Sequence, residues 1–189
     1  MLVRRCTDSE EQTGTLPQLS CSPLCRTKGS SMRGAETESE RKLVGDVRDY
    51  GWHVINVPAD DKGPGFSYTI GLYHTFHHPE LIVVGLPITT GHQILNLAGE
   101  FIRNGAIYRD GSEADKLLDG YRCRFRTLAI EHYGDYVGYA VWFYEAEPFP
   151  ILQLIYPDSN HRFPWEEGAT PAFRSMQSIG EDDSGNPPS

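Results

Sequence analysis

The feature that most constrains the fold is a strand-like segment at residues 66–72. Its side chains alternate between large apolar and small polar types, which is typical of a β-strand with two different faces. Residues 81–86 follow as a nearly unbroken apolar run, as expected of a central strand that is buried on both faces. The two segments predict a β-sheet with a buried middle, and the alternation favours antiparallel neighbours.

Three segments carry the helical spacing of apolar residues. The first begins at a capping box at residues 37–40 and stops at Gly51. The second runs from candidate threonine caps at residues 89–90 to Gly105, and the third covers residues 133–144. Because these helices interrupt the strands at irregular intervals, we expect the α+β class, a single domain with a mainly antiparallel sheet and about three helices.

Further strands are expected at residues 52–57, 121–130 and 151–156. The polar segment at residues 108–120 is expected to be irregular. Residues 73–79 form a short histidine-rich connection between the two strands that define the sheet.

Both ends of the chain lack this patterning. Residues 1–31 have no apolar periodicity, so we expect a disordered tail or the upstream translation of a protein that starts at Met32. The domain is expected over residues 32–168. Residues 169–189 are expected to form a flexible, acidic C-terminal tail.

Charge and cysteine content exclude several classes of protein. The 17 Lys and Arg residues against 26 Asp and Glu residues give a formal net charge of −9, which argues against a nucleic-acid surface. No run of 18 apolar residues predicts a membrane span, and no secretory signal is visible, so a cytoplasmic location is expected. Cys21 and Cys25 are spaced like half a zinc site, but no second ligand pair follows in that segment.

Three separated blocks match one family in the correct order. They are F-S-Y-T-I-G-L at residues 66–72, H-P-E-L at residues 78–81, and L-Q-L-I-Y-P-D at residues 152–158 with R-F-P-W at residues 162–165. With these blocks the chain resembles a mainly bacterial family, the domain of unknown function 4262, over residues 42–168. The resemblance implies a fold and a set of signature residues, but no activity. It also supports a start at Met32.

The candidate ligand-binding surface joins the polar face of residues 66–72 to the far end of the last strand. Its members are Ser67, Thr69, Gln153, Asp158, Arg162 and Trp165. The polar strand face could hold a ligand or another segment of backbone. Asp158 and Arg162 are also spaced to pair with each other and fix the turn. Trp165 suits a packing anchor better than a stacking wall for a planar ligand.

His78 and Glu80 are the candidate catalytic residues. They lie two positions apart at the entry of an apolar strand, so in strand conformation they share a face and form an acid–base pair. An ionised Glu80 beside a buried strand needs a partner. The structural alternative, which we favour, is a salt bridge to Arg124, Arg126 or Arg162, or hydrogen bonds from turn amides.

Two cofactors remain as alternatives, and neither is favoured. His74, His77 and His78 have the spacing of weak zinc ligands, with a solvated loop as the alternative. The order of elements over residues 65–105 is similar to the flavin-binding segment of flavin-reductase-like split barrels, which would make the cofactor FMN.

Three classes of function follow. The first is a domain that binds a small ligand or a protein partner without chemistry. The second is an enzyme, either a hydrolase that uses His78 and Glu80 with or without a metal ion, or a flavin-dependent enzyme. The third is a defence or toxin-neutralising partner protein, since an acidic domain suits a basic target. The sequence leaves the oligomeric state open.

Overall fold

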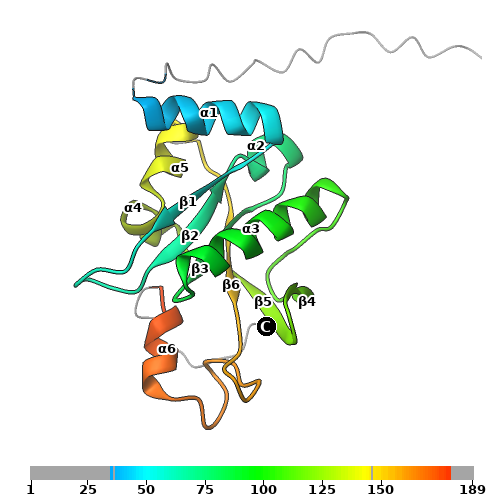
Figure 1. Cartoon of the computed structure of the whole chain (residues 1–189), viewed down its shortest axis with the longest axis vertical. Coiled ribbons are helices and arrows are strands. Elements are labelled where there is room, and N and C mark those ends of the chain that lie inside the picture. Colours follow the sequence, from blue (N-terminus) through cyan, green and yellow to red (C-terminus); the bar gives the residue numbers. More distant parts are fainter. Residues whose placement is uncertain (1–34, 36, 146, 180–189) are drawn as a thin grey trace, which may run out of the picture. The chain divides into compact units, whose positions relative to one another are not determined.

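The computed structural model describes residue 35 and residues 37–145 and 147–179. In this part of the chain, six strands form one sheet with the order β1-β2-β3-β6-β5-β4 (Figure 1). The strands are β1 (His53–Val57), β2 (Phe66–Ile70), β3 (Glu80–Val84), β4 (Glu113–Leu118), β5 (Tyr121–Thr127) and β6 (Ile151–Ile155). The helices are α1 (Glu38–Tyr50), α2 (Leu72–Phe76), α3 (Ile88–Arg103), the 3₁₀-helix η1 (Ile130–His132), α4 (Tyr133–Tyr136), α5 (Gly138–Phe143) and α6 (Pro171–Gln177).

The α+β class is confirmed, but the sheet is mixed. β1 with β2, β2 with β3, β4 with β5 and β5 with β6 pair antiparallel. β3 and β6 pair parallel at the centre of the sheet. A parallel pair needs a long crossover connection, and here the chain between them includes α3 and the β4–β5 hairpin. Hydropathy predicts the buried strands but not this connection.

The helices also outnumber the three that the sequence predicts. α2 occupies the histidine-rich connection, and the helix expected over residues 133–144 is divided at Val137, where φ is −124° and ψ is 40°. α6 follows the expected end of the domain at residue 168. Helices of four to seven residues span at most two turns, which is too short for a clear periodic signal.

The ends of the longer elements follow local chemistry. In α1 the capping box is confirmed, because Thr37 accepts from the Glu40 amide at 3.2 Å and Glu40 accepts from the Thr37 amide at 2.8 Å. Gly51 ends α1 with a left-handed φ of 98°. By contrast α3 begins directly after Pro87, whose restricted φ suits a helix start, so the threonines at residues 89–90 lie inside the first turn rather than capping it.

The segment at residues 108–120, which the sequence predicts to be irregular, contains β4. This strand lies at the edge of the sheet and turns into β5 at Gly120, where φ is 76°. Three of its six side chains are polar and exposed, as is common for an edge strand, and its apolar residues Ala114, Leu117 and Leu118 do not alternate with them, so it carries no clear apolar pattern. The strand expected over residues 121–130 ends earlier, at Thr127.

The two faces of the sheet carry separate hydrophobic cores. α3 packs on one face over Val54, Leu81 and Phe125. α1, α4 and α5 cover the other face, where Tyr68 and Ile82 are buried. Both faces of β2 are therefore covered, so its small polar side chains are not exposed to solvent.

Residues 169–189, expected as a flexible tail, include α6. Gln177 is buried, donates to the Tyr156 carbonyl at 2.9 Å and accepts from the Tyr156 amide at 3.1 Å. Its own carbonyl accepts from Gln153 at 2.5 Å. These bonds attach α6 to the end of β6. Residues 1–34 and 180–189 lie outside the described residues, as do the predictions made for them.

Replacing Gln177 with alanine is expected to lower the free energy of unfolding by about 1–2 kcal/mol, because two backbone groups of Tyr156 lose their partner. Urea denaturation of the full chain measures this change. The exposed Ser175 of the same helix, replaced by alanine, serves as the control and should change stability by less than about 0.5 kcal/mol. Equal effects of the two substitutions would show that Gln177 does not anchor α6.

Candidate functional site

Glu80 is fully buried at the point where β2 and β3 separate. Its carboxylate accepts from the Thr69 hydroxyl at 2.6 Å, the Gly71 amide at 2.8 Å and the Tyr73 amide at 3.1 Å, and also from the Tyr144 hydroxyl. Burial raises the pKa of Glu80, although these hydrogen bonds act in the opposite direction. Of the partners proposed from the sequence, the turn amides are the ones that Glu80 contacts.

His78 is also buried, two residues before Glu80. β3 begins only at Glu80, so His78 lies outside the strand. Its Nε2 accepts from the Tyr108 amide at 2.9 Å, which leaves Nδ1 to donate to the Pro79 carbonyl at 2.7 Å. Burial lowers the pKa of His78. No hydrogen bond joins it to Glu80 among the described residues, and both of its ring nitrogens are occupied.

The polar residues of the central strands also bond inside the protein. Ser67 donates to Asn56 Oδ1 at 2.8 Å and lies beneath α3, where a Cβ on Gly91 would come within 3.0 Å of its hydroxyl. The Thr69 hydroxyl donates to Glu80 and accepts a 2.8 Å hydrogen bond from the Leu81 amide. The small polar face of β2 at Ser67 therefore packs against the backbone of α3. The sequence pattern allowed either a ligand or another segment of backbone on this face.

Asp158, Arg162 and Trp165 lie together in the turn after β6. Asp158 accepts from the Arg162 amide at 2.9 Å and forms a 2.9 Å ion pair with its side chain, which pins the turn. Trp165 stacks on Phe163 with ring centroids 4.8 Å apart, and the Arg124 guanidinium lies over both rings. These contacts fix the loop and leave each of these side chains with a packing partner.

The three clustered histidines do not converge. His77 ends α2 in a left-handed conformation, the His74 ring packs edge-on to Phe143, and His78 bonds as described above. No group of three or more histidine, cysteine, aspartate or glutamate side chains in the described part of the chain could hold a metal ion. The described sheet is also open, with β1 and β4 at its edges, so its topology gives the split-barrel analogy no support.

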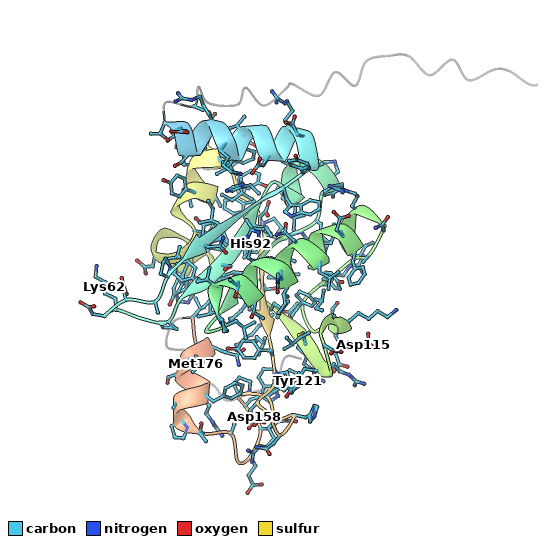
Figure 2. The ribbon with its side chains drawn as sticks, viewed as in Figure 1. Lys62, His92, Asp115, Tyr121, Asp158 and Met176 are labelled. Atoms are coloured by element: carbon cyan, nitrogen blue, oxygen red, sulfur yellow. The ribbon has the colours of Figure 1, made fainter. Side chains whose placement is uncertain are left out.

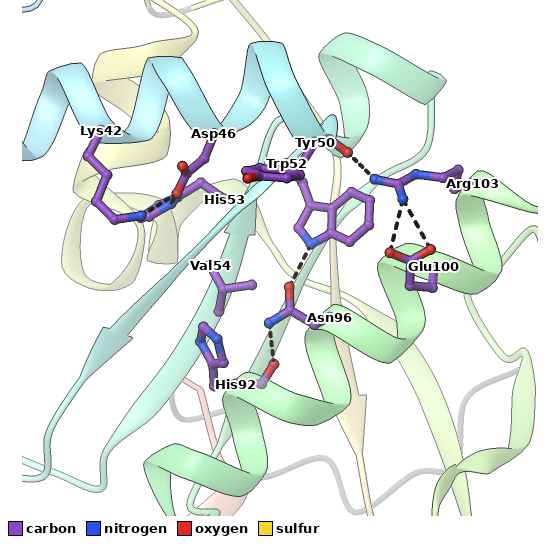
Figure 3. Close-up of a pocket in the computed structure, with 10 residues that line it drawn as sticks. All are labelled: Lys42, Asp46, Tyr50, Trp52, His53, Val54, His92, Asn96, Glu100 and Arg103. Atoms are coloured by element: carbon purple, nitrogen blue, oxygen red, sulfur yellow. Dashed lines mark hydrogen bonds and ion pairs between the residues drawn. The ribbon is translucent and has the colours of Figure 1, made fainter.

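A cavity of about 300 Å³ lies elsewhere, between α1, the edge strand β1 and α3 (Figure 3). We call it the α1–α3 cavity. Its lining comprises Lys42, Asp46, Tyr50, Trp52, His53, Val54, His92, Asn96, Glu100 and Arg103. None of the site residues proposed from the sequence lines it. In Figure 2, His92 on α3 and Asp158 in the turn after β6 are well separated, so the cavity and that turn are different places.

Asp46 and His53 form the polar centre of one wall. Asp46 Oδ2 lies 2.7 Å from His53 Nδ1 and 2.5 Å from Lys42 Nζ. Burial opposes the ionisation of Asp46, but the hydrogen bonds with Lys42 and His53 prevail and lower its pKa. Burial lowers the pKa of His53 in spite of Asp46. Near neutral pH the pair is therefore a carboxylate beside a neutral imidazole.

His92 belongs to the opposite wall, on α3. Figure 3 shows its ring extending from the helix toward Val54 of β1. Its Nδ1 lies 3.1 Å from the side-chain amide nitrogen of Asn56. Asn56 Oδ1 already accepts from Ser67, the buried polar residue of β2. Ser67 therefore helps to orient the Asn56 amide and, through it, the His92 ring in the cavity.

Trp52 fixes the spacing of the cavity walls. Its indole nitrogen donates to Asn96 at 3.0 Å, and the Arg103 guanidinium lies 4.6 Å from the ring centroid. On the helix side the ring lies against Gly99, where a Cβ would come within 2.5 Å of it. Arg103 also pairs with Glu100 at 3.0 Å and donates to the Tyr50 carbonyl. The Trp52 ring thus packs between the start of β1 and α3 and sets the distance between them.

The sequence does carry a weak signal for this cavity. His92, Asn96, Glu100 and Arg103 recur every three or four residues, which places them on one face of α3. Such a stripe is usually a solvated helix face, and nothing local shows that it lies opposite Asp46. The side chains that form the cavity meet only because α1 and α3 both pack at β1.

The open mixed sheet, with helices on both faces, defines a small α+β domain whose polar cavity lies at the first edge strand. The chain belongs to the family described as "Domain of unknown function (DUF4262)", which it matches over residues 46–170. No curated protein and no solved structure matches the chain. Within the described residues, no helix is long and apolar enough to cross a membrane.

Proposed function

We propose that this protein binds a small, polar, uncharged molecule in the α1–α3 cavity. The observation that carries the proposal is the pair of imidazoles in the lining. His53 has one ring nitrogen bound to Asp46 and His92 has one beside Asn56, and neither has a second partner in the described part of the chain. Each therefore offers one ring nitrogen for a ligand.

The charges of the lining favour a neutral ligand. Lys42 is paired with Asp46, and Arg103 is paired with Glu100. A charged ligand would have to compete with an existing ion pair, whereas a neutral one needs only hydrogen bonds. The volume of about 300 Å³ lies at the lower end of the range for ligand sites, which suits a small molecule rather than a peptide.

This proposal keeps the ligand-binding function expected from the sequence and moves it to different residues. Ser67, Thr69, Gln153, Asp158 and Arg162 have hydrogen-bond partners within the protein, so their contribution is structural. The protein-partner and toxin-neutralising alternatives gain no specific support, because no described feature identifies a basic target.

Binding is tested by adding nucleosides, monosaccharides and small cyclic amides, one at a time, to the full chain while its histidine side chains are observed by NMR. At least one of these neutral probes is expected to shift the His53 and His92 resonances in a saturable manner. Replacing either histidine with glutamine should weaken binding by about threefold to tenfold, since each removes one hydrogen bond.

Replacing the exposed His74 with glutamine provides the matched control and should leave binding unchanged, because His74 does not line the cavity. A phosphorylated or carboxylated form of the same probe should bind less tightly than the neutral form. The proposal is wrong if no probe at millimolar concentration shifts either resonance, or if the charged forms bind best.

A further inference from the structure

We infer that the α1–α3 cavity is a site of proton transfer, in which His53 is a general base and His92 is a hydrogen-bond donor to developing negative charge. This inference rests on the proposed binding function and adds a chemical activity to it. The substrate class is a small uncharged molecule with an acidic C–H or O–H bond.

The hydrogen bonds of His53 define it as the base. Asp46 is an acceptor only, so the 2.7 Å contact places the imidazole proton on Nδ1. The lone pair then lies on Nε2, the nitrogen without a partner among the described residues. A carboxylate that holds one nitrogen of a histidine fixes its tautomer and orientation and offsets the charge that forms when the ring takes up a proton.

The hydrogen bonds of His92 define the opposite tautomer. Asn56 Oδ1 accepts from Ser67, so the Asn56 amide group donates through Nδ2 to His92 Nδ1. In the neutral ring the proton therefore lies on Nε2. One cavity thus contains an imidazole that can accept a proton and another that can donate a hydrogen bond. Proton transfer needs both, because one group removes the proton from one atom of the substrate while the other stabilises the negative charge that develops on another atom.

The groups around His53 keep its ring in the neutral form. Lys42 and Asp46 face His53 from α1, and His92, Glu100 and Arg103 line the cavity from α3. Burial and the positive charge of Lys42 favour the neutral form of His53, whose pKa is lowered, while the hydrogen bond and the negative charge of Asp46 favour the protonated form. Near neutral pH the base is unprotonated and ready to react.

The step balances without a further reactant. His53 Nε2 takes the substrate proton, and the electron pair of the broken bond forms a new π bond as a leaving group departs. His92 Nε2–H donates a hydrogen bond to the atom on which negative charge collects. The imidazolium of His53 finally gives its proton to the departing anion or, where that anion is a weak base such as a nitrophenolate, to water, which restores the neutral base.

The pair that the sequence proposes for this chemistry is unsuited to it. Both nitrogens of His78 are hydrogen-bonded inside the protein, and Glu80 is fully buried among four donors. By contrast, His53 and Asp46 line a cavity. The geometry thus moves the acid–base function from the entry of β3 to the edge strand β1.

The probe reaction is the ring opening of 5-nitrobenzisoxazole, a small neutral molecule. A base removes the proton on C3, the electron pair forms a nitrile, and the N–O bond breaks to release a coloured phenolate. The full chain is expected to accelerate this reaction with saturation. Replacing His53 with glutamine should reduce kcat/KM by at least about tenfold, since general bases contribute typically 10²–10⁴-fold.

Asp46 acts through His53 and is a positioning residue, so its test uses the pH profile. In wild type, kcat/KM should rise as His53 loses its proton, with a midpoint below the ordinary histidine pKa of about 6.5. Replacing Asp46 with asparagine removes the group that favours protonation, so the midpoint should move to lower pH while the rate falls. A merely structural role would change the rate without this shift.

Binding of the same probe, observed at the His53 and His92 resonances, separates the two proposals. The proton-transfer inference is wrong, and the binding function stands, if a neutral molecule binds in the cavity but His53→Gln reacts as fast as wild type. The same conclusion follows if the neutral panel binds but 5-nitrobenzisoxazole does not. If nothing binds, both are wrong. His74→Gln should match wild type throughout, and circular dichroism establishes that each variant is folded.

Discussion

Replacing Glu80 with alanine is expected to lower the free energy of unfolding by about 3–5 kcal/mol, enough to unfold a marginally stable domain. The substitution removes the carboxylate that accepts from the Gly71 and Tyr73 amides and from the hydroxyls of Thr69 and Tyr144. Each buried donor that loses its partner costs about 1–3 kcal/mol. Urea denaturation measures the change, and the exposed Glu131, replaced by alanine, is the control.

The glutamine variant of Glu80 tests the protonation state. Burial raises the pKa of Glu80 in the folded protein. Its contribution to stability is therefore fully present below the unfolded pKa of about 4.3 and is lost as the pH rises through the folded pKa. Glutamine cannot ionise, so Glu80→Gln should gain stability relative to wild type as the pH rises from 5 to 8. A change in the opposite direction would contradict the raised pKa.

Alanine at Gly99 and at Gly45 is expected to change stability in opposite directions. At Gly99 the new methyl group would lie 2.5 Å from the Trp52 ring, so α3 must move, at a cost of about 1–3 kcal/mol. At Gly45 in α1 nothing lies within 4 Å, and alanine should add roughly 1 kcal/mol through its higher helix propensity. The two variants should therefore differ by about 2–4 kcal/mol.

Thermal unfolding of both variants measures this difference. The tryptophan resonance of Trp52 should also change in Gly99→Ala, because displacement of α3 lengthens the bond from its indole nitrogen to Asn96. In Gly45→Ala that resonance should stay in place. If Gly99→Ala is as stable as wild type, the close approach of α3 to β1 is not required, and the α1–α3 cavity does not depend on it.

The elements that the sequence predicts well are those stabilised by neighbours in the sequence. The capping box of α1 uses residues three apart, and Gly51 ends that helix by its own left-handed conformation. The alternation of residues 66–72 and the apolar run of residues 81–86 likewise predict β2 and β3. The edge strand β4 escapes prediction because half of its side chains are polar and exposed and its apolar residues do not alternate with them.

The candidate site depends on distant contacts and is therefore the part that sequence reasoning reaches least. The motif residues are conspicuous because they are polar within apolar strands. In the structure Thr69 and the turn amide of Gly71 donate to Glu80, and Ser67 donates to Asn56. Buried polar residues need partners, whether or not they bind anything else. Polarity in a strand therefore does not by itself distinguish a ligand site from an internal network.

By itself, the sequence determined the α+β class, the first helix, the two core strands and the family. It did so because capping, strand alternation and apolar runs act over a few residues. Only the tertiary structure decided that β6 lies parallel to β3 and that Asp46, His53 and His92 line one cavity. These residues come from α1, β1 and α3. Their meeting depends on packing helices on both faces of one edge strand, which no local pattern encodes.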